Sequence, residues 1–337
     1  MNALSNNTRI PLLFQRLKDA GFDRAYVRKA ALPDWWDESV LETTDGYAQT
    51  LTLLSRNLGL DLRSLQNAEV PVACREFGVT CFKKKQNDAE DDVKQAQCIA
   101  ARAAQLVSHA LPLPFTAVPP GATEIRATIC KGMNQWVDFE GLLDYCWDIG
   151  IPVLHVSRFP KGAHKMDGMA ARIKGRPVIV LSKNSHYSAL LLFVLAHELG
   201  HIACGHLAEN GLLIDEKIEN DDDNEHEIAA NAFAVELLTG SPDRAYRAVR
   251  NMTAQQLADA AQRVSEREGV YPGVVALNYA WNKGQRVVGQ AALALLEPEA
   301  NAVAAVHARM RSRLDWERLP AESRRFLLYV TGADKAF

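Results

Sequence analysis

The sequence lacks a long hydrophobic run. Its longest apolar stretch, Ala189 to Ala196, is far shorter than the roughly 20 residues that a helix needs to cross a bilayer. The first residues also lack the charged-then-apolar pattern of a secretory signal peptide. We therefore expect a cytoplasmic protein that does not insert into membranes.

Cysteine is scarce and carries no recognisable spacing. The six cysteines are scattered, and none forms a Cys-x-x-Cys pair. This excludes a small disulfide-rich module and fits a reducing compartment. The chain also lacks a large excess of positive charge, because its net charge is −3. General attraction to nucleic acid is therefore not expected.

The remaining composition is that of a globular protein. The chain has 337 residues, 48% of them hydrophobic and 23% charged, which suffices for two or three domains with real cores. Alanine-rich helical patterns dominate. Four prolines between Leu111 and Gly121 break them first, and Gly240-Ser241-Pro242 breaks them again.

The most informative stretch is His197-Glu198-Leu199-Gly200-His201. The preceding apolar residues from Tyr187 predict a buried helix, on which histidines four residues apart share one face and can bind one metal ion. The glutamate between them is the residue type that takes a proton from water in zinc peptidases. The motif predicts His197 and His201 as Zn²⁺ ligands and Glu198 as the catalytic base.

Catalytic zinc usually has a third protein ligand. The extended motif with a third histidine fails here, because that position is Leu207. We predict Glu227 instead, in the first turn of a second, alanine-rich helix, with His206 and Glu225 as competing ligands. Asn231 lies one turn after Glu227, and we expect it to orient a metal-binding imidazole from behind.

The order of elements around these motifs resembles the ImmA/IrrE family of metallopeptidases. The resemblance covers a helix at 139–147, a strand at 150–154 and hairpin strands at 168–174 and 177–181, and then the two signature stretches around His197-Glu198 and Ala230-Asn231-Ala232. Ala229 and Gly240 depart from the family pattern, where an acidic residue and a proline are common. Neither position touches the predicted ligands.

The predicted fold class is α+β: mainly helical, with a small sheet or hairpin packed against the His-Glu-x-x-His helix. We expect a helical part at residues 1–68, followed by a connector with a proline-rich linker at 69–120. A zinc metallopeptidase domain at 121–240 and a helical C-terminal domain at 241–337 are expected to follow. Relatives of such peptidases are often fused to or encoded beside a helix-turn-helix protein of the XRE type. The first part is therefore read as a degenerate XRE-like region. The polar base-reading helix expected after Gln49 to Leu60 is missing, which favours a structural or partner-docking role over DNA binding.

Two further predictions concern residues near the motif. An exposed hairpin strand formed by Val178, Ile179, Val180 and Leu181 is expected to pair with an extended substrate. Cys204, three residues past His201, has two interpretations: a regulatory thiol that reaches the metal, or a small buried core residue.

The sequence thus predicts a zinc endopeptidase. The resemblance implies a substrate that is a regulatory protein, namely a helix-turn-helix repressor or antitoxin, cut to derepress stress, mobile-element or defence genes. The rival interpretation is a non-proteolytic regulator that binds DNA or a partner around a structural metal. Autocleavage within Leu111 to Gly121 is a third.

Overall fold

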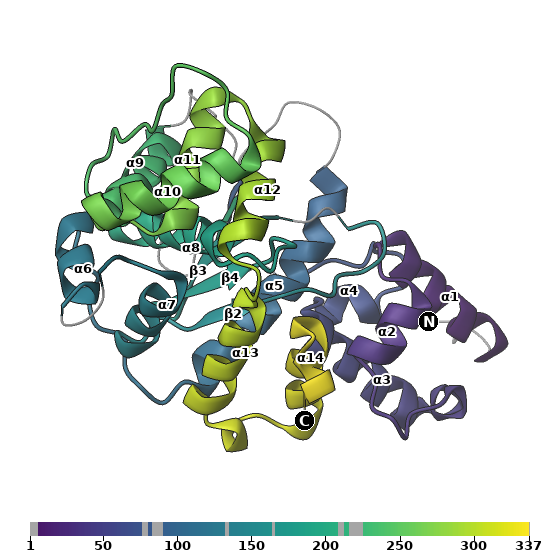
Figure 1. The fold of residues 1–337 in the computed structure, drawn as a ribbon. Helices are drawn as coiled ribbons and strands as arrows, with labels where there is room; N and C mark the ends of the chain where they lie inside the picture. Colours follow the sequence, from purple (N-terminus) through teal and green to yellow (C-terminus); the bar gives the residue numbers. More distant parts are fainter. Residues whose placement is uncertain are drawn as a thin grey trace.

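The computed structural model describes residues 6–75, 80–82, 90–131, 135–163, 166–207, 212–215 and 225–336. Within them the chain is mainly helical, with one mixed sheet (Figure 1). The α+β fold class predicted from the sequence is confirmed. No described helix has both the length and the apolar character needed to cross a membrane.

The helices of the N-terminal and central parts of the chain are α1 (Asn6–Asp19), α2 (Arg24–Ala30), α3 (Thr44–Leu58), α4 (Leu62–Gln66), α5 (Glu90–Ala110), α6 (Ala122–Ile129), α7 (Phe139–Asp148), α8 (Ser188–Ala203) and α9 (Glu225–Thr239). The remaining helices follow as α10 (Ala254–Glu268), α11 (Pro272–Lys283), α12 (Arg286–Leu296), α13 (Ala302–Arg313) and α14 (Ala321–Thr331). Short 3₁₀ helices cover Glu38–Glu42, Trp316–Arg318 and Ala333–Ala336.

The sheet has the strand order β1-β5-β3-β4-β2. Its strands are β1 (Thr80–Phe82), β2 (Val153–His155), β3 (Gly168–Ile173), β4 (Arg176–Leu181) and β5 (Leu212–Asp215). The predicted hairpin is β3–β4, which is antiparallel, and its two-residue turn is Lys174-Gly175, both with positive φ. β2 lies parallel to β4 and β1 parallel to β5.

The sheet is covered on both sides in its middle. Five consecutive residues of β4 are buried, and a strand buried at every position needs cover on both faces. α8 and α5 both pack against β3 and β4 and provide that cover. The metal-motif helix α8 therefore lies between the sheet and the helices α7, α9 and α11, which also pack against it.

The prediction that Val178, Ile179 and Val180 bind substrate is wrong. β4 pairs with β3 along one edge and with β2 along the other, so both rows of backbone hydrogen-bonding groups are used. All three side chains have 0% exposure. A substrate strand therefore has no free edge of β4 to pair with. The sequence predicted the hairpin but not that β2 pairs with the other edge of β4.

Helices from the two ends of the chain lie together. α14 packs against α2 and α3 (Figure 1). The Tyr26 and Tyr329 rings meet edge to face, with their centroids 6.0 Å apart. Arg325 donates to backbone carbonyls of α2, among them Lys29 at 3.1 Å. One continuous apolar core runs through all these helices, and the division into four parts stays a prediction.

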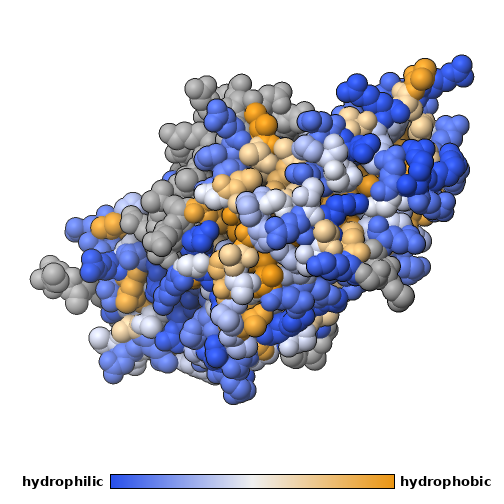
Figure 2. Space-filling model, turned by 90° about the vertical axis from the view of Figure 1, so that its left-hand side faces the viewer, coloured by the Kyte–Doolittle hydropathy of each residue, from blue (hydrophilic) through white to orange (hydrophobic). Residues whose placement is uncertain are grey.

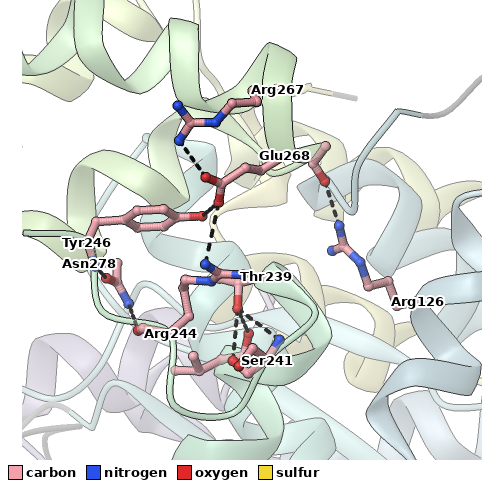
Figure 3. Close-up of polar contacts among 10 residues, drawn as sticks. Arg126, Thr239, Ser241, Arg244, Tyr246, Arg267, Glu268 and Asn278 are labelled. Atoms are coloured by element: carbon pink, nitrogen blue, oxygen red, sulfur yellow. Dashed lines mark hydrogen bonds and ion pairs between the residues drawn. The ribbon is translucent and has the colours of Figure 1, made fainter.

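A polar junction holds the end of α9 against the next helices (Figure 3). Arg126 of α6 donates to the carbonyl oxygens of Leu237 and Leu238 at 3.1 and 2.9 Å and also to that of Gly269. Glu268 accepts from Tyr246 at 3.1 Å.

On the face turned toward the viewer in Figure 2, hydrophilic residues cover most of the surface and hydrophobic ones gather in a band near its middle.

The covalent state of two cysteines differs from the expectation. Cys74 and Cys98 are joined by a disulfide between the segment after α4 and helix α5. Their separation of 24 residues has no motif spacing, so the sequence pattern did not indicate the pair.

Candidate metal centre

Helix α8 places three functional side chains in the interior. His197, Glu198 and His201 each have 0% exposure. The helix is apolar nearly all round, as a helix must be when it is packed on every side. Its two histidines are one turn apart, and their Nε2 atoms lie 3.0 Å from each other.

Helix α9 supplies the third donor. Glu227, in its first turn, has 3% exposure, with Oε2 lying 3.4 Å from His197 Nε2 and Oε1 lying 3.4 Å from His201 Nε2. Burial raises the pKa of Glu227, but hydrogen bonds from His197 and His201 outweigh it and hold the pKa well below its usual range. The carboxylate is therefore ionised, which is the state that binds a metal.

These three residues fit a zinc ion. Among the described residues, one ligand atom from each of His197, His201 and Glu227 lies within 4.8 Å of the others. Two imidazoles and a carboxylate, with a position left for water, are the donor set of catalytic zinc. The predicted ligand set is thus brought together in space.

The two competing ligands lie elsewhere. Glu225 is exposed at the start of α9. His206 is beside the centre but behind it, with its Nδ1 2.9 Å from Nδ1 of His201. That nitrogen faces away from the Nε2 that meets Glu227, so His206 contacts a ligand rather than the metal position.

Each histidine is held from behind by a second side chain. Asn231 Oδ1 lies 3.0 Å from His197 Nδ1, as its position one turn after Glu227 predicted. His206 plays the same part for His201. Burial, and then the charges of His201 and His226, lower the pKa of His206 to about 4, so its ring is neutral and can accept a hydrogen bond. Both ligands can then keep a proton on Nδ1 and present Nε2 to the metal.

Two glycines that the sequence analysis did not single out allow this packing. A methyl group at Gly200 would lie 3.0 Å from the Ala230 carbonyl oxygen and 3.1 Å from Phe233 Cδ1, so α9 crosses α8 closely there. A methyl group at Gly168 would lie 2.8 Å from the carboxyl carbon of Glu198 and nearer still to Oε1. The start of β3 thus runs directly against the predicted catalytic base.

Cys204 lies at the C-terminal cap of α8 and is exposed, so it is not the buried core residue of one interpretation. Partial burial raises the pKa of its thiol, which disfavours the thiolate that the regulatory interpretation requires. Nor is Cys204 among the grouped metal donors.

A comparison with protein families finds one match to this region. The model of the Peptidase_M78 family, described as an IrrE N-terminal-like domain, matches residues 150–278. No curated protein and no solved structure matched the chain. The matched residues include β2 to β5, both metal-site helices, α10 and part of α11. Residues 150–278, somewhat more than a third of the chain, are therefore similar to the IrrE N-terminal-like domain of ImmA/IrrE-type metallopeptidases.

Proposed function

We propose that the protein is a zinc-dependent endopeptidase that cuts a regulatory protein, namely a helix-turn-helix repressor or antitoxin, and so derepresses stress, mobile-element or defence genes. The observation that carries the proposal is a buried carboxylate, Glu198, on the same helix as two histidines that meet a third donor from α9. A purely structural metal site has no use for such a carboxylate.

The chemistry assigns one task to each group. His197, His201 and Glu227 would hold Zn²⁺, which polarises the scissile carbonyl and makes a water molecule acidic enough to attack it near neutral pH. Glu198 takes the proton from that water and passes it to the leaving nitrogen. Burial of the centre excludes bulk water and strengthens these electrostatic effects.

The substrate class rests on the family match and on the chemistry of the site. An endopeptidase with a buried centre acts on extended or locally unfolded segments, such as linkers between the domains of a regulator. A cytoplasmic location belongs to the same proposal, and for the XRE-like region we propose a structural or partner-docking role rather than DNA binding.

The test uses Glu198→Gln, which keeps the size of the side chain and removes the base. Wild type or variant is co-expressed with each helix-turn-helix protein encoded nearby, and fragments and reporter derepression are measured. We expect cleavage to fall by about a hundredfold to ten-thousandfold, while zinc binding and folding persist. Glu225→Gln, which changes an exposed carboxylate outside the metal group, should cut like wild type.

The outcomes separate the two classes of function. Loss of cleavage and of derepression in Glu198→Gln alone supports the peptidase. Derepression by Glu198→Gln at the wild-type level would show that the protein acts by binding, without proteolysis.

A further inference from the structure

The disulfide between Cys74 and Cys98 is distinct from the other described cysteines. Its Cα atoms are 5.8 Å apart, and it links the segment 67–75 to α5. Cys130, Cys146 and Cys204 are free thiols, and burial raises the pKa of each. Thiols with a raised pKa are poor nucleophiles, so among the cysteines whose side chains the structure describes, this bond is the better candidate for thiol chemistry.

The disulfide lies in the wall of a cavity. The cavity has a volume of about 890 Å³ and is lined by both cysteines and by side chains such as Asp19, Glu69 and Lys94. Cys98 is only 1% exposed, whereas Cys74 is half-buried. A molecule in the cavity therefore reaches the Cys74 sulfur first, and Cys98 is the sulfur that would leave.

Two arginines lie around Gly59, whose carbonyl oxygen is 3.5 Å from Cys98 Sγ. Arg75 directly follows Cys74, and its backbone nitrogen donates to the Gly59 carbonyl oxygen at 2.8 Å. Its guanidinium donates to the Leu60 carbonyl oxygen at 3.2 Å. The positive charge of Arg75 is thus fixed beside the segment that carries the disulfide.

Arg102 lies one helical turn after Cys98 and so shares its face of α5. A methyl group built on Gly59 would meet Arg102 Cβ at 3.3 Å and Cys98 Sγ at 3.8 Å, which places both around the same point. Arg56, in the last turn of α3, is a third cation, and its charge contributes to lowering the pKa of Arg102.

The arginine cluster, defined as Arg56, Arg75 and Arg102, lacks an acidic partner among the described residues, because none of the ion pairs there includes any of its members. Burial, and then the charges of Arg75 and Arg56, lower the pKa of Arg102 to about 10. Its Nε is buried without a hydrogen-bond partner. An anion formed at this place would relieve the repulsion.

We propose that Cys74–Cys98 is a redox-active disulfide that exchanges with a low-molecular-weight thiol in the cavity, and that the arginine cluster favours the reduced form by stabilising the thiolate released at Cys98. Cations beside a thiolate make it a better leaving group and stabilise the reduced state of a disulfide.

The exchange balances in two steps. The deprotonated small thiol attacks Cys74 Sγ, a new S–S bond forms, and the electron pair of the old bond leaves on Cys98 Sγ. A second small thiolate attacks the outer sulfur of the mixed disulfide, so that Cys74 leaves as a thiolate. Two small thiols are oxidised to their disulfide, two electrons reach the protein, and the two protons pass to its thiolates or to solvent. The segment 67–75 is then no longer tied to α5, the helix that packs on β3 and β4.

The equilibrium is measured in buffers of reduced and oxidised glutathione, by alkylating free thiols and counting them by mass spectrometry. Wild type should exchange fully at millimolar glutathione. Arg102→Met and Arg56→Gln should shift the equilibrium toward the disulfide by about three- to tenfold, since losing a neighbouring cation changes a thiol pKa by roughly half to one unit. Arg102→Lys should stay near wild type, as should Arg63→Gln on the exposed side of α4.

The attacked sulfur is identified with single-cysteine variants. Oxidised glutathione should modify Cys74 in Cys98→Ser faster than Cys98 in Cys74→Ser. A thioredoxin-type dithiol protein serves as a second reductant, and reduction by it alone would exclude the small thiol. A disulfide that persists in millimolar reduced glutathione, or an equilibrium unchanged in both Arg102→Met and Arg56→Gln, would overturn the proposal.

Discussion

At the scale of single residues, the metal centre depends on which ring nitrogen of each histidine carries the proton. Asn231 contacts Nδ1 of His197 and His206 contacts Nδ1 of His201, at 3.0 and 2.9 Å. Only Nε2 of each ring then faces Glu227. The position of Asn231 was predictable from helical spacing, whereas the sequence offered His206 only as a competing ligand, and the geometry places it behind His201 instead.

Removing these contacts should weaken zinc binding without destroying the centre. Asn231→Ala and His206→Ala should each lower zinc affinity about ten- to hundredfold, because ligand orientation and tautomer are no longer fixed. Competition with a chromophoric chelator measures the affinity. Asn282→Ala, an exposed asparagine on α11, is the control. An affinity equal to that of the control would show that His206 and Asn231 do not position the ligands.

The third ligand is tested directly. Glu227→Ala should lower zinc affinity by at least about a hundredfold, since the site keeps only two protein donors. Glu225→Ala should bind zinc like wild type, because that carboxylate is exposed and outside the group. The same competition assay decides between them, and the reverse order of effects would reassign the ligand to Glu225.

At the scale of elements, the centre forms where α8 and α9 cross closely. Gly200 lies at the crossing, 3.0 Å from the Ala230 carbonyl oxygen when a methyl group is added. Ala230 follows Glu227 by nearly one turn, so any shift of α9 at this point moves the carboxylate away from the histidines.

Gly200→Val should therefore separate the helices and reduce zinc content well below one per chain. The added side chain has no space, and because valine has a higher helix propensity than glycine, any loss comes from this steric conflict. Ala232→Val adds the same kind of side chain to a half-buried position of α9 and should retain zinc. Zinc content and thermal unfolding are measured for both variants, and full zinc in Gly200→Val would contradict the account of the crossing.

The sequence predicted those elements whose signals are local. The metal-motif helix follows from an apolar run around a fixed motif, and the β3–β4 hairpin follows from the resemblance in the order of elements around Gly175. The pairing of β2 with β4, and of β1 and β5 beyond β3, was not predictable, because it joins segments distant along the chain. For that reason the strand Val178 to Leu181 was taken for an exposed edge when it is central. The roles of Gly168 and Gly200 likewise depend on what packs against them.

At the scale of the whole molecule, the C-terminal helices support the metal helix directly. Glu297, which follows α12 and is 7% exposed, accepts hydrogen bonds from the backbone nitrogens of Ser188 at 2.7 Å and Ala189 at 3.2 Å. These nitrogens lie in the first turn of α8 and have no acceptor within the helix, and a carboxylate there also complements the helix dipole. Burial raises the pKa of Glu297, while the hydrogen bonds that its carboxylate accepts from the Ser188 and Ala189 backbone nitrogens lower it. Glu297 thus acts as a cap at the start of α8.

Glu297→Ala should lower the free energy of unfolding by about 1 to 2 kcal/mol, the usual cost of losing a helix cap. Glu299→Ala, an exposed carboxylate two residues later, should change it little. Chemical denaturation of both variants measures the difference. Equal stability would mean that Glu297 does not anchor the C-terminal helices to α8.

The central claim is that His197, His201 and Glu227 form a zinc centre, and the metal content of the purified protein tests it most directly. Elemental analysis of wild type, Glu198→Gln and His197→Ala, all prepared without added metal, should give about one zinc per chain in the first two and little in the third, because only the third loses a ligand. Equal zinc in His197→Ala and wild type, or no zinc in wild type at all, would contradict the account.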